Sequence, residues 1–160
     1  MADRREAPAV IDDWADLVIA LLDANARFIV VGAHALSVHG VPRATQDLDV
    51  WIDPSADNAA RVWSALAAFG APLAALGISV EDLSADDTVV QVGLPPNRVD
   101  LLTGITGVSS FAEAWHSRVM QRVRGREIPF LGRDALVANK RATGRLKDRA
   151  DLEALGEDSP

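Results

Sequence analysis

The chain has 160 residues, of which 49% are hydrophobic, so it is long enough for one domain with a buried core and too apolar for a disordered chain. Its net charge of −7 argues against bulk attraction to nucleic acid, and the lack of cysteine excludes disulfides, thiolate metal sites and cysteine nucleophiles. No apolar run reaches the roughly 18–20 residues that cross a bilayer, and residues 1–10 lack the apolar core of a signal peptide. We therefore expect a cytoplasmic protein with no membrane segment.

The first half of the chain is predicted to alternate between helices and strands. We expect a helix over 12–25, a strand over 27–32, a short helix over 33–40, a strand over 46–53 and a helix over 53–70. In the last helix, Asp53 is the expected N-cap, Pro54 the first helical residue and Gly70 the end. Its expected buried stripe consists of Ala59, Val62, Trp63, Leu66 and Phe69.

The second half is predicted to continue the same mixture. We expect a connector over 71–87 with room for a short helix, strands over 88–93 and 98–105, a helix over 109–118, a hairpin over 119–132, and helices over 133–143 and 148–156. This order predicts an α/β fold (α+β in stricter usage), with a short mixed sheet flanked by helices. One domain is expected over 1–160, with a core at about 28–131 and a C-terminal helical part at about 133–156.

The strand over 46–53 has one apolar and one acidic face. Because successive side chains of a strand point to opposite faces, Leu48, Val50 and Ile52 form a core face. The other face receives three acids, Asp47, Asp49 and Asp53, together with Trp51. Trp51 could stack on a base there or pack within the wall of the fold.

A third strand adds an acid with the matching phase. In "RVDLL", Val99 and Leu101 form the core face, so Asp100 points the other way. If the two strands are neighbours, Asp47, Asp49 and Asp100 converge, and each like-charge pair at ~4 Å costs about 4 kcal/mol. Carboxylate oxygens held together in this way favour Mg²⁺ or Mn²⁺. The alternative is that these acids are caps, turn residues or surface acids.

Just upstream, "VVGAHAL" runs from a strand into a helix through Gly32. Such a junction offers backbone N–H groups and a positive helix end to a phosphate. The P-loop pattern G-x-x-x-x-G-K-[ST] is absent, which argues against that type of ATPase.

Three stretches together, "VVGAHALSVHGVPRATQDLDVWID", "RVDLLTGI" and "DALVANKRATGRLKDRADLEAL", resemble the DNA polymerase β-type nucleotidyltransferase superfamily. The closer likeness is to a small bacterial group that includes the AbiEii-like toxins and related minimal nucleotidyltransferases. The resemblance spans roughly residues 28–155, nearly the whole chain. It implies a polymerase β-type core with C-terminal helices.

The resemblance also implies roles for particular residues. Gly32 would shape the phosphate-binding turn, and Asp47 and Asp49 would bind metal. Asp100 would bind metal and activate the acceptor as a base. Lys140 resembles the helical lysine of the family, which contacts the nucleotide phosphates.

The chain departs from the family pattern at two places. Ala33 stands where the family has a second Gly or Ser, so this position offers only its backbone N–H to a triphosphate. Lys147 replaces the Arg of the final Arg-Asp-x-x-Asp-Leu motif, a point charge in place of a planar fork. Within that motif, Asp148 aligns with the first acid, and the resemblance implies a place for it among the nucleotide-binding residues, or it is simply the N-cap of the last helix. Whether Asp148 or Asp151 is the functional match of the motif stays open.

Three further residues are candidates for nucleotide contact. Arg43 and Thr45 precede the acidic strand and could touch phosphate or cap a turn, and His34 starts the short helix. The segment 118–149 holds ten of the sixteen Lys and Arg residues but only three acids. It is either a solvated polar face or an anion-facing lobe for phosphates or RNA, such as a tRNA.

These observations predict a metal-dependent nucleotidyltransferase. It would use Mg²⁺ or Mn²⁺ to transfer a nucleoside monophosphate from a nucleoside triphosphate, such as ATP, to an unidentified acceptor. The acceptor could be an RNA end, a protein hydroxyl or a small molecule, and a toxin role would bring an antitoxin partner. Two alternatives stay open, a degenerate protein that binds nucleotide or a partner without chemistry, and a metal-dependent nuclease.

Overall fold

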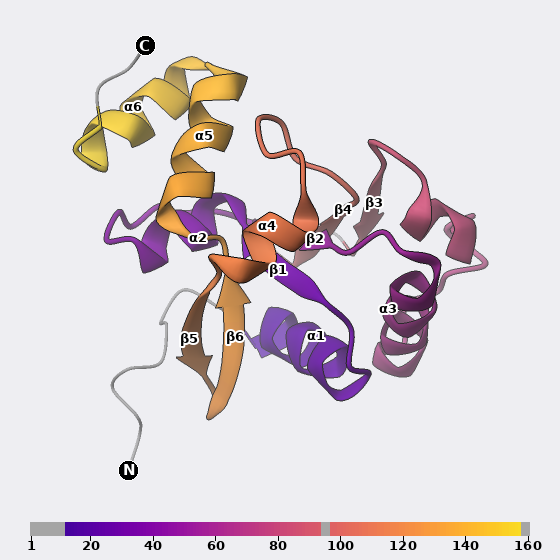
Figure 1. Cartoon of the computed structure of the whole chain (residues 1–160). Helices are drawn as coiled ribbons and strands as arrows, with labels where there is room; N and C mark the ends of the chain where they lie inside the picture. Colours follow the sequence, from indigo (N-terminus) through magenta and orange to yellow (C-terminus); the bar gives the residue numbers. More distant parts are fainter. Residues whose placement is uncertain (1–11, 94–96, 158–160) are drawn as a thin grey trace.

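The computed structural model of the chain describes residues 12–93 and 97–157, so the expectation that the N-terminus carries no signal peptide concerns residues outside this range. Six strands form one mixed sheet in the order β3-β4-β2-β1-β6-β5 (Figure 1). The strands are β1 (Phe28–Val31), β2 (Asp47–Ile52), β3 (Val89–Val92), β4 (Arg98–Leu102), β5 (Val119–Val123) and β6 (Arg126–Phe130). The helices are α1 (Asp12–Asp23), α2 (Gly32–Val38), α3 (Ala56–Phe69), α4 (Phe111–His116), α5 (Arg133–Thr143) and α6 (Leu146–Ala154), with a 3₁₀ turn η1 (Val80–Ser84). The predicted α/β fold with a mixed sheet flanked by helices is confirmed.

Strand β2 lies in the middle of the sheet and joins the two halves of the fold. It pairs antiparallel with β1 and parallel with β4. In this register Asp49 lies opposite Val31 on β1 and opposite Asp100 on β4. The expectation that the two acid-bearing strands are neighbours is therefore confirmed.

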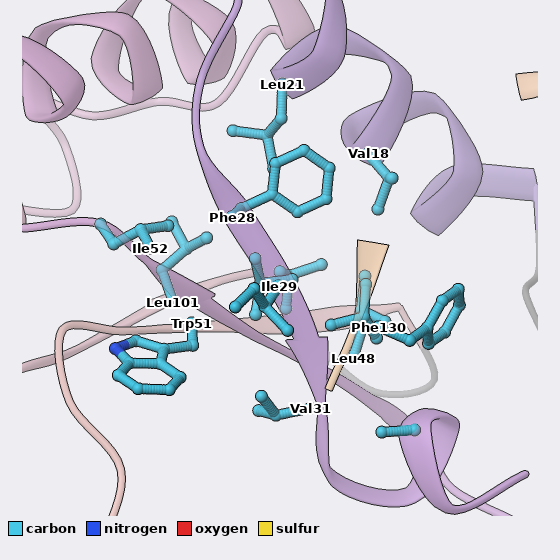
Figure 2. Close-up of a cluster of buried hydrophobic side chains, with 14 of the residues drawn as sticks. Val18, Leu21, Phe28, Ile29, Val31, Leu48, Trp51, Ile52, Leu101 and Phe130 are labelled. Carbon is cyan, nitrogen blue, oxygen red and sulfur yellow. The ribbon is translucent and has the colours of Figure 1, made fainter. Parts of the chain in front are cut away.

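The apolar face of β2 belongs to the core. Leu48, Val50 and Ile52 are each at most 1% exposed. Figure 2 shows Phe28 of β1, the cross-strand partner of Ile52, next to Leu21 of α1. Helices α1 and α3 bury their apolar stripes against this side because each has apolar residues at helical spacing. Burial on one face of β2 fixes its register, which sends the alternate residues to the opposite face.

The start and the buried stripe of α3 differ from the prediction. Ser55, and not Asp53, is the N-cap, because its hydroxyl accepts a hydrogen bond from the backbone N–H of Asn58. Pro54 therefore precedes the helix, and the Asp53 carboxylate accepts from the Ser55 N–H. Asp53 lies beyond the end of β2 and is not part of the acidic group at the other end of the strand. Phe69, predicted to be buried, is 38% exposed, whereas the predicted end at Gly70 is confirmed by its left-handed backbone.

The C-terminal helices pack against each other beyond the sheet, and Figure 1 places them at the opposite end of the view from α1 and α3. Helix α6 begins at Leu146, two residues before the predicted start. The predicted break at Gly144 is confirmed, since this residue ends α5 in a left-handed conformation. None of the helices in the described part of the chain is long and apolar enough to cross a membrane.

Candidate active site

The acidic face of β2 meets β4 at one end of the sheet. Asp49 and Asp100 are direct partners across the two strands, and Asp47 lies two residues before Asp49 on the same face. The Asp49 carboxylate also presses on the start of α2, where a Cβ added to Gly32 would overlap Asp49 Oδ2. Gly32 has a φ of +69° as well, so both the backbone conformation and the space require glycine there.

The proximity of these acids changes their ionisation. Burial, followed by the charges of Asp100 and Asp47, raises the pKa of Asp49 to about 6. Burial also raises the pKa of Asp100, with Asp47 adding to the effect and Arg98 opposing it. This end of the sheet therefore holds more negative charge than its protein surroundings neutralise.

Arg98 of β4 reaches into this acidic group, a contact that the acidic pattern of the sequence did not predict. Its Nη2 donates a hydrogen bond to Asp47 Oδ2 at 2.8 Å, and its Nε lies 3.3 Å from Asp100 Oδ1. The i, i+2 spacing of Arg98 and Asp100 on one strand was the available signal. The predicted convergence of three carboxylates is thus modified, because a guanidinium lies between Asp47 and Asp100.

A pocket of about 280 Å³ opens beside the acids. One side of it is formed by the acidic strand and the start of α2, including Asp47, Asp49, Gly32 and Ala33. We call the other side the basic wall, which consists of Arg43, Lys140, Arg145, Lys147 and Asp151. The pocket therefore has the carboxylates of β2 on one side and an excess of cations on the other.

The basic wall is built on a buried ion network between α5 and α6. Asp148 is fully buried and accepts hydrogen bonds from the Arg145 Nε at 2.7 Å and Nη2 at 3.2 Å, and from the Thr143 hydroxyl at 2.7 Å. Lys140 Nζ lies 3.3 Å from Asp148 Oδ1 and 3.0 Å from Asp151 Oδ2. Asp151 also pairs with Arg43, which ties α6 to the segment before β2.

Ionisation within this network follows from its hydrogen bonds. Burial alone would raise the pKa of Asp148, but the hydrogen bonds from Arg145 and Thr143 hold it well below its usual range. Burial lowers the pKa of Lys140, an effect that the Asp148 charge opposes. The planar fork that Lys147 cannot supply is thus present two residues earlier, in Arg145.

The other predicted nucleotide contacts divide into two groups. Ala33, Arg43 and Thr45 line the pocket, and the Thr45 hydroxyl braces the backbone N–H and C=O of Asp47 at 3.1 Å. His34 and Asp148 are not among the lining residues. The predicted nucleotide contact of His34 does not fit its position, because the ring is 3% exposed and packs edge-on against Trp14. Asp148 is placed to orient Arg145 and Lys140, and it does not face the pocket.

Packing bears on two interpretations that the sequence left open. Trp51 is 2% exposed and contacts Phe111 edge-on at 5.2 Å, so it packs in the wall and is not open to a base. In the basic segment, several arginines pair with acids elsewhere in the fold, namely Arg124 with Asp16, Arg126 with Asp23, and Arg133 and Arg141 with Glu157. These contacts favour a solvated, internally paired face for that part of the segment.

The three acids have the donor atoms that a divalent cation prefers, but their side chains are not arranged around a common point. All donors are carboxylate oxygens, and Asp47 Oδ1 and Asp100 Oδ1 are buried with no hydrogen-bond partner. Among residues 12–93 and 97–157, no group of three or more His, Cys, Asp or Glu side chains is already arranged to hold a metal ion.

The fold of the chain is similar to that of a solved structure. The chain resembles the crystal structure of a protein named "putative nucleotidyltransferase" from Thermotoga maritima, with a TM-score of 0.58 over 88% of each chain and 14% sequence identity. At this identity the likeness concerns the fold. No protein-family model and no curated protein sequence matches the chain.

Proposed function

We propose that the protein is a metal-dependent nucleotidyltransferase that transfers a nucleoside monophosphate from a nucleoside triphosphate to an acceptor hydroxyl. The observation that carries this proposal is the pocket with Asp47 and Asp49 on one side and the basic wall on the other. Neighbouring carboxylates with raised pKa values and a wall of cations are the two parts that phosphoryl-group chemistry needs. The nucleotidyltransferase-type fold supports the same reading.

Each part of the site, namely the pocket lining and the adjoining Asp100, would have a distinct task. Asp47, Asp49 and Asp100 would hold Mg²⁺ or Mn²⁺, which when bound neutralises charge on the triphosphate. Asp100 would accept the proton of the acceptor hydroxyl, a task suited to a carboxylate with a raised pKa. The acceptor oxygen would then bond to the α-phosphorus as the bond to pyrophosphate breaks, while the basic wall holds the negatively charged leaving group.

The identity of the acceptor is the open part of the proposal. Following the resemblance to AbiEii-like toxins, we propose an RNA end such as that of a tRNA as the first acceptor to test, with a protein hydroxyl and a small molecule after it. An antitoxin protein would be the matching partner. ATP is the first triphosphate to test, alongside the other three.

The experiment is transfer of label from each α-labelled NTP, with Mg²⁺ and total cellular RNA or lysate. Asp49→Asn should reduce transfer by about 10³-fold or more, a loss typical of removing a group that stabilises the transition state. Asp86→Asn, at an exposed acid far from the pocket in sequence, should leave transfer unchanged. Equal transfer by wild type and Asp49→Asn would reject the assignment, and shortening of RNA without NTP would indicate a nuclease.

A binding protein without turnover is the second candidate. Two observations favour it, the alanine at position 33 and the guanidinium of Arg98 between two of the proposed metal ligands. In this case NTP with Mg²⁺ would raise the melting temperature of the protein by mass action, and no label would be transferred.

A further inference from the structure

Arg98 occupies the place between two acids that the proposed reaction assigns to a metal ion. It is the Cα partner of Asp47 across the parallel β2–β4 pair, and it precedes Asp100 by two residues on the same face of β4. Its guanidinium therefore reaches Asp47 Oδ2 through Nη2 at 2.8 Å and comes within 3.3 Å of Asp100 Oδ1 through Nε. One positive side chain thus neutralises part of two carboxylates at once.

The pairing made by Arg98 is incomplete. Arg98 Nε and Asp100 Oδ1 are both buried, and neither has a hydrogen-bond partner although they lie close together. Asp47 Oδ1, on the far side of the bonded oxygen, is also buried without a partner. Buried polar atoms of this kind are costly and rare in a finished ion pair.

A second arginine–aspartate pair in the chain shows the complete arrangement. Arg145 grips Asp148 with both Nε and Nη2, and Thr143 and the Arg145 backbone N–H also donate to the Asp148 carboxylate. None of the atoms of that pair is left unsatisfied among the described buried groups. Arg98 lacks this saturation, so a competitor with stronger demand for the carboxylate oxygens can replace it.

We propose that Arg98 is a displaceable internal cation, which holds Asp47 and Asp100 together in the metal-free protein and yields these carboxylates to a divalent cation on metal binding. This inference rests on the proposed function, since the competing ion is the metal of that reaction. It assigns Arg98 as a positioning residue that sets how readily the site loads. Loss of its charge should make metal bind more tightly and make the metal-free protein less stable.

Binding of Mn²⁺ alone, followed by electron paramagnetic resonance or calorimetry, tests the first consequence. Arg98→Gln should bind Mn²⁺ at least tenfold more tightly than wild type. Arg98→Lys keeps the charge and should stay within about threefold of wild type, which separates the effect of charge from that of folding. Arg126→Gln, in an exposed ion pair with Asp23, is the matched control and should leave Mn²⁺ affinity unchanged. Equal or weaker binding by Arg98→Gln overturns the inference.

Urea unfolding in EDTA tests the second consequence without any metal. Arg98→Gln should lower the unfolding midpoint of the wild-type chain, and it should lower it much less in an Asp47→Asn background, because Arg98 donates its hydrogen bond to Asp47. Equal losses in both backgrounds would contradict the role of Arg98 as the cation of this pair.

The two proposals fail in different ways. If wild type binds Mn²⁺ in an Asp49-dependent manner and Arg98→Gln is no tighter, only the Arg98 inference falls. If neither wild type nor Arg98→Gln binds Mn²⁺ and no label is transferred, the metal-dependent reaction falls, and displacement of Arg98 falls with it.

Discussion

The two sides of the pocket hold their charges in opposite ways. In the network that supports the basic wall, Asp148 is saturated by hydrogen bonds and its pKa is held low. On the acidic side, Asp49 has a raised pKa, and Asp47 and Asp100 each keep a buried oxygen without a partner. The carboxylate behind the basic wall is thus fully hydrogen-bonded in the folded protein, whereas the acidic side lacks enough positive charge to neutralise its carboxylates.

This difference has a physical meaning. A saturated network costs little to maintain and fixes side chains in place, whereas unneutralised carboxylates weaken the fold and gain most when a cation arrives. Mutations on the basic wall should therefore appear first as loss of stability. Mutations on the acidic side should appear first as loss of ligand binding and chemistry.

The largest effect on stability is expected at Asp148. Asp148→Ala leaves the buried Lys140 with one of its two carboxylate partners and frees Arg145, so we expect a loss of about 3–5 kcal/mol in the free energy of unfolding. Urea denaturation measures it. Glu127→Gln, which removes an exposed pair with Arg122, is the control and should cost less than about 1 kcal/mol. A loss below 1 kcal/mol for Asp148→Ala would show that the Asp148 network contributes little to the free energy of unfolding.

The pH dependence of stability at Asp49 should have the opposite sign to that expected for a carboxylate with a lowered pKa, such as Asp148. Because the pKa of Asp49 is raised from 3.8 to about 6 in the folded state, the folded protein binds more protons than the unfolded one between these values. The contribution of Asp49 is therefore greatest below about pH 4 and is lost as pH rises through 6, by up to about 3 kcal/mol.

Asp49→Asn isolates this contribution in metal-free buffer. The variant should lose less stability than wild type between pH 4 and pH 7, as measured by urea unfolding at each pH. Parallel profiles for wild type and variant would mean that the Asp49 carboxylate is already neutralised in the folded protein.

A smaller effect is expected where the acidic side meets α2. Gly32→Ala must adopt a φ of +69° and also overlap Asp49 Oδ2, whereas Gly77→Ala meets the same φ of +69° with no atom within 4 Å of its Cβ. Both variants should lose about 1 kcal/mol from backbone strain, and Gly32→Ala about 1–2 kcal/mol more. Thermal unfolding compares them, and equal losses would show that Asp49 can move away from Gly32 at no cost.

Periodicity was sufficient to predict the frame of this fold, and it was insufficient for much of the site. Leu48, Val50 and Ile52 fixed the phase of β2, and the matching phase of Asp100 predicted its approach to Asp49 once the strands were paired. The position of Arg98 follows the same i, i+2 rule. A positive side chain is not a metal ligand, however, so the pattern of acids did not predict its contact with Asp47 and Asp100. His34 was predicted to contact the nucleotide, but its position does not fit such a contact. A residue at a helix start can point to the core or to the pocket, and the His34 ring packs against Trp14 in the core.

The smallest effect on stability is expected for arginines of the basic segment 118–149 that lie outside the pocket. Arg124 and Arg126 on the β5–β6 hairpin pair with Asp16 and Asp23 of α1, and all four side chains are at least 36% exposed. Each exposed pair of this kind contributes about 0–1 kcal/mol, so Arg124→Gln with Arg126→Gln, which removes two pairs, should shift the free energy of unfolding by no more than about 2 kcal/mol. If transfer depends on the pocket alone, the double variant should also retain wild-type transfer to RNA. A selective loss of transfer to RNA, with transfer to a small acceptor intact, would instead make the hairpin part of an RNA-binding face and extend the chemically active region beyond the basic wall.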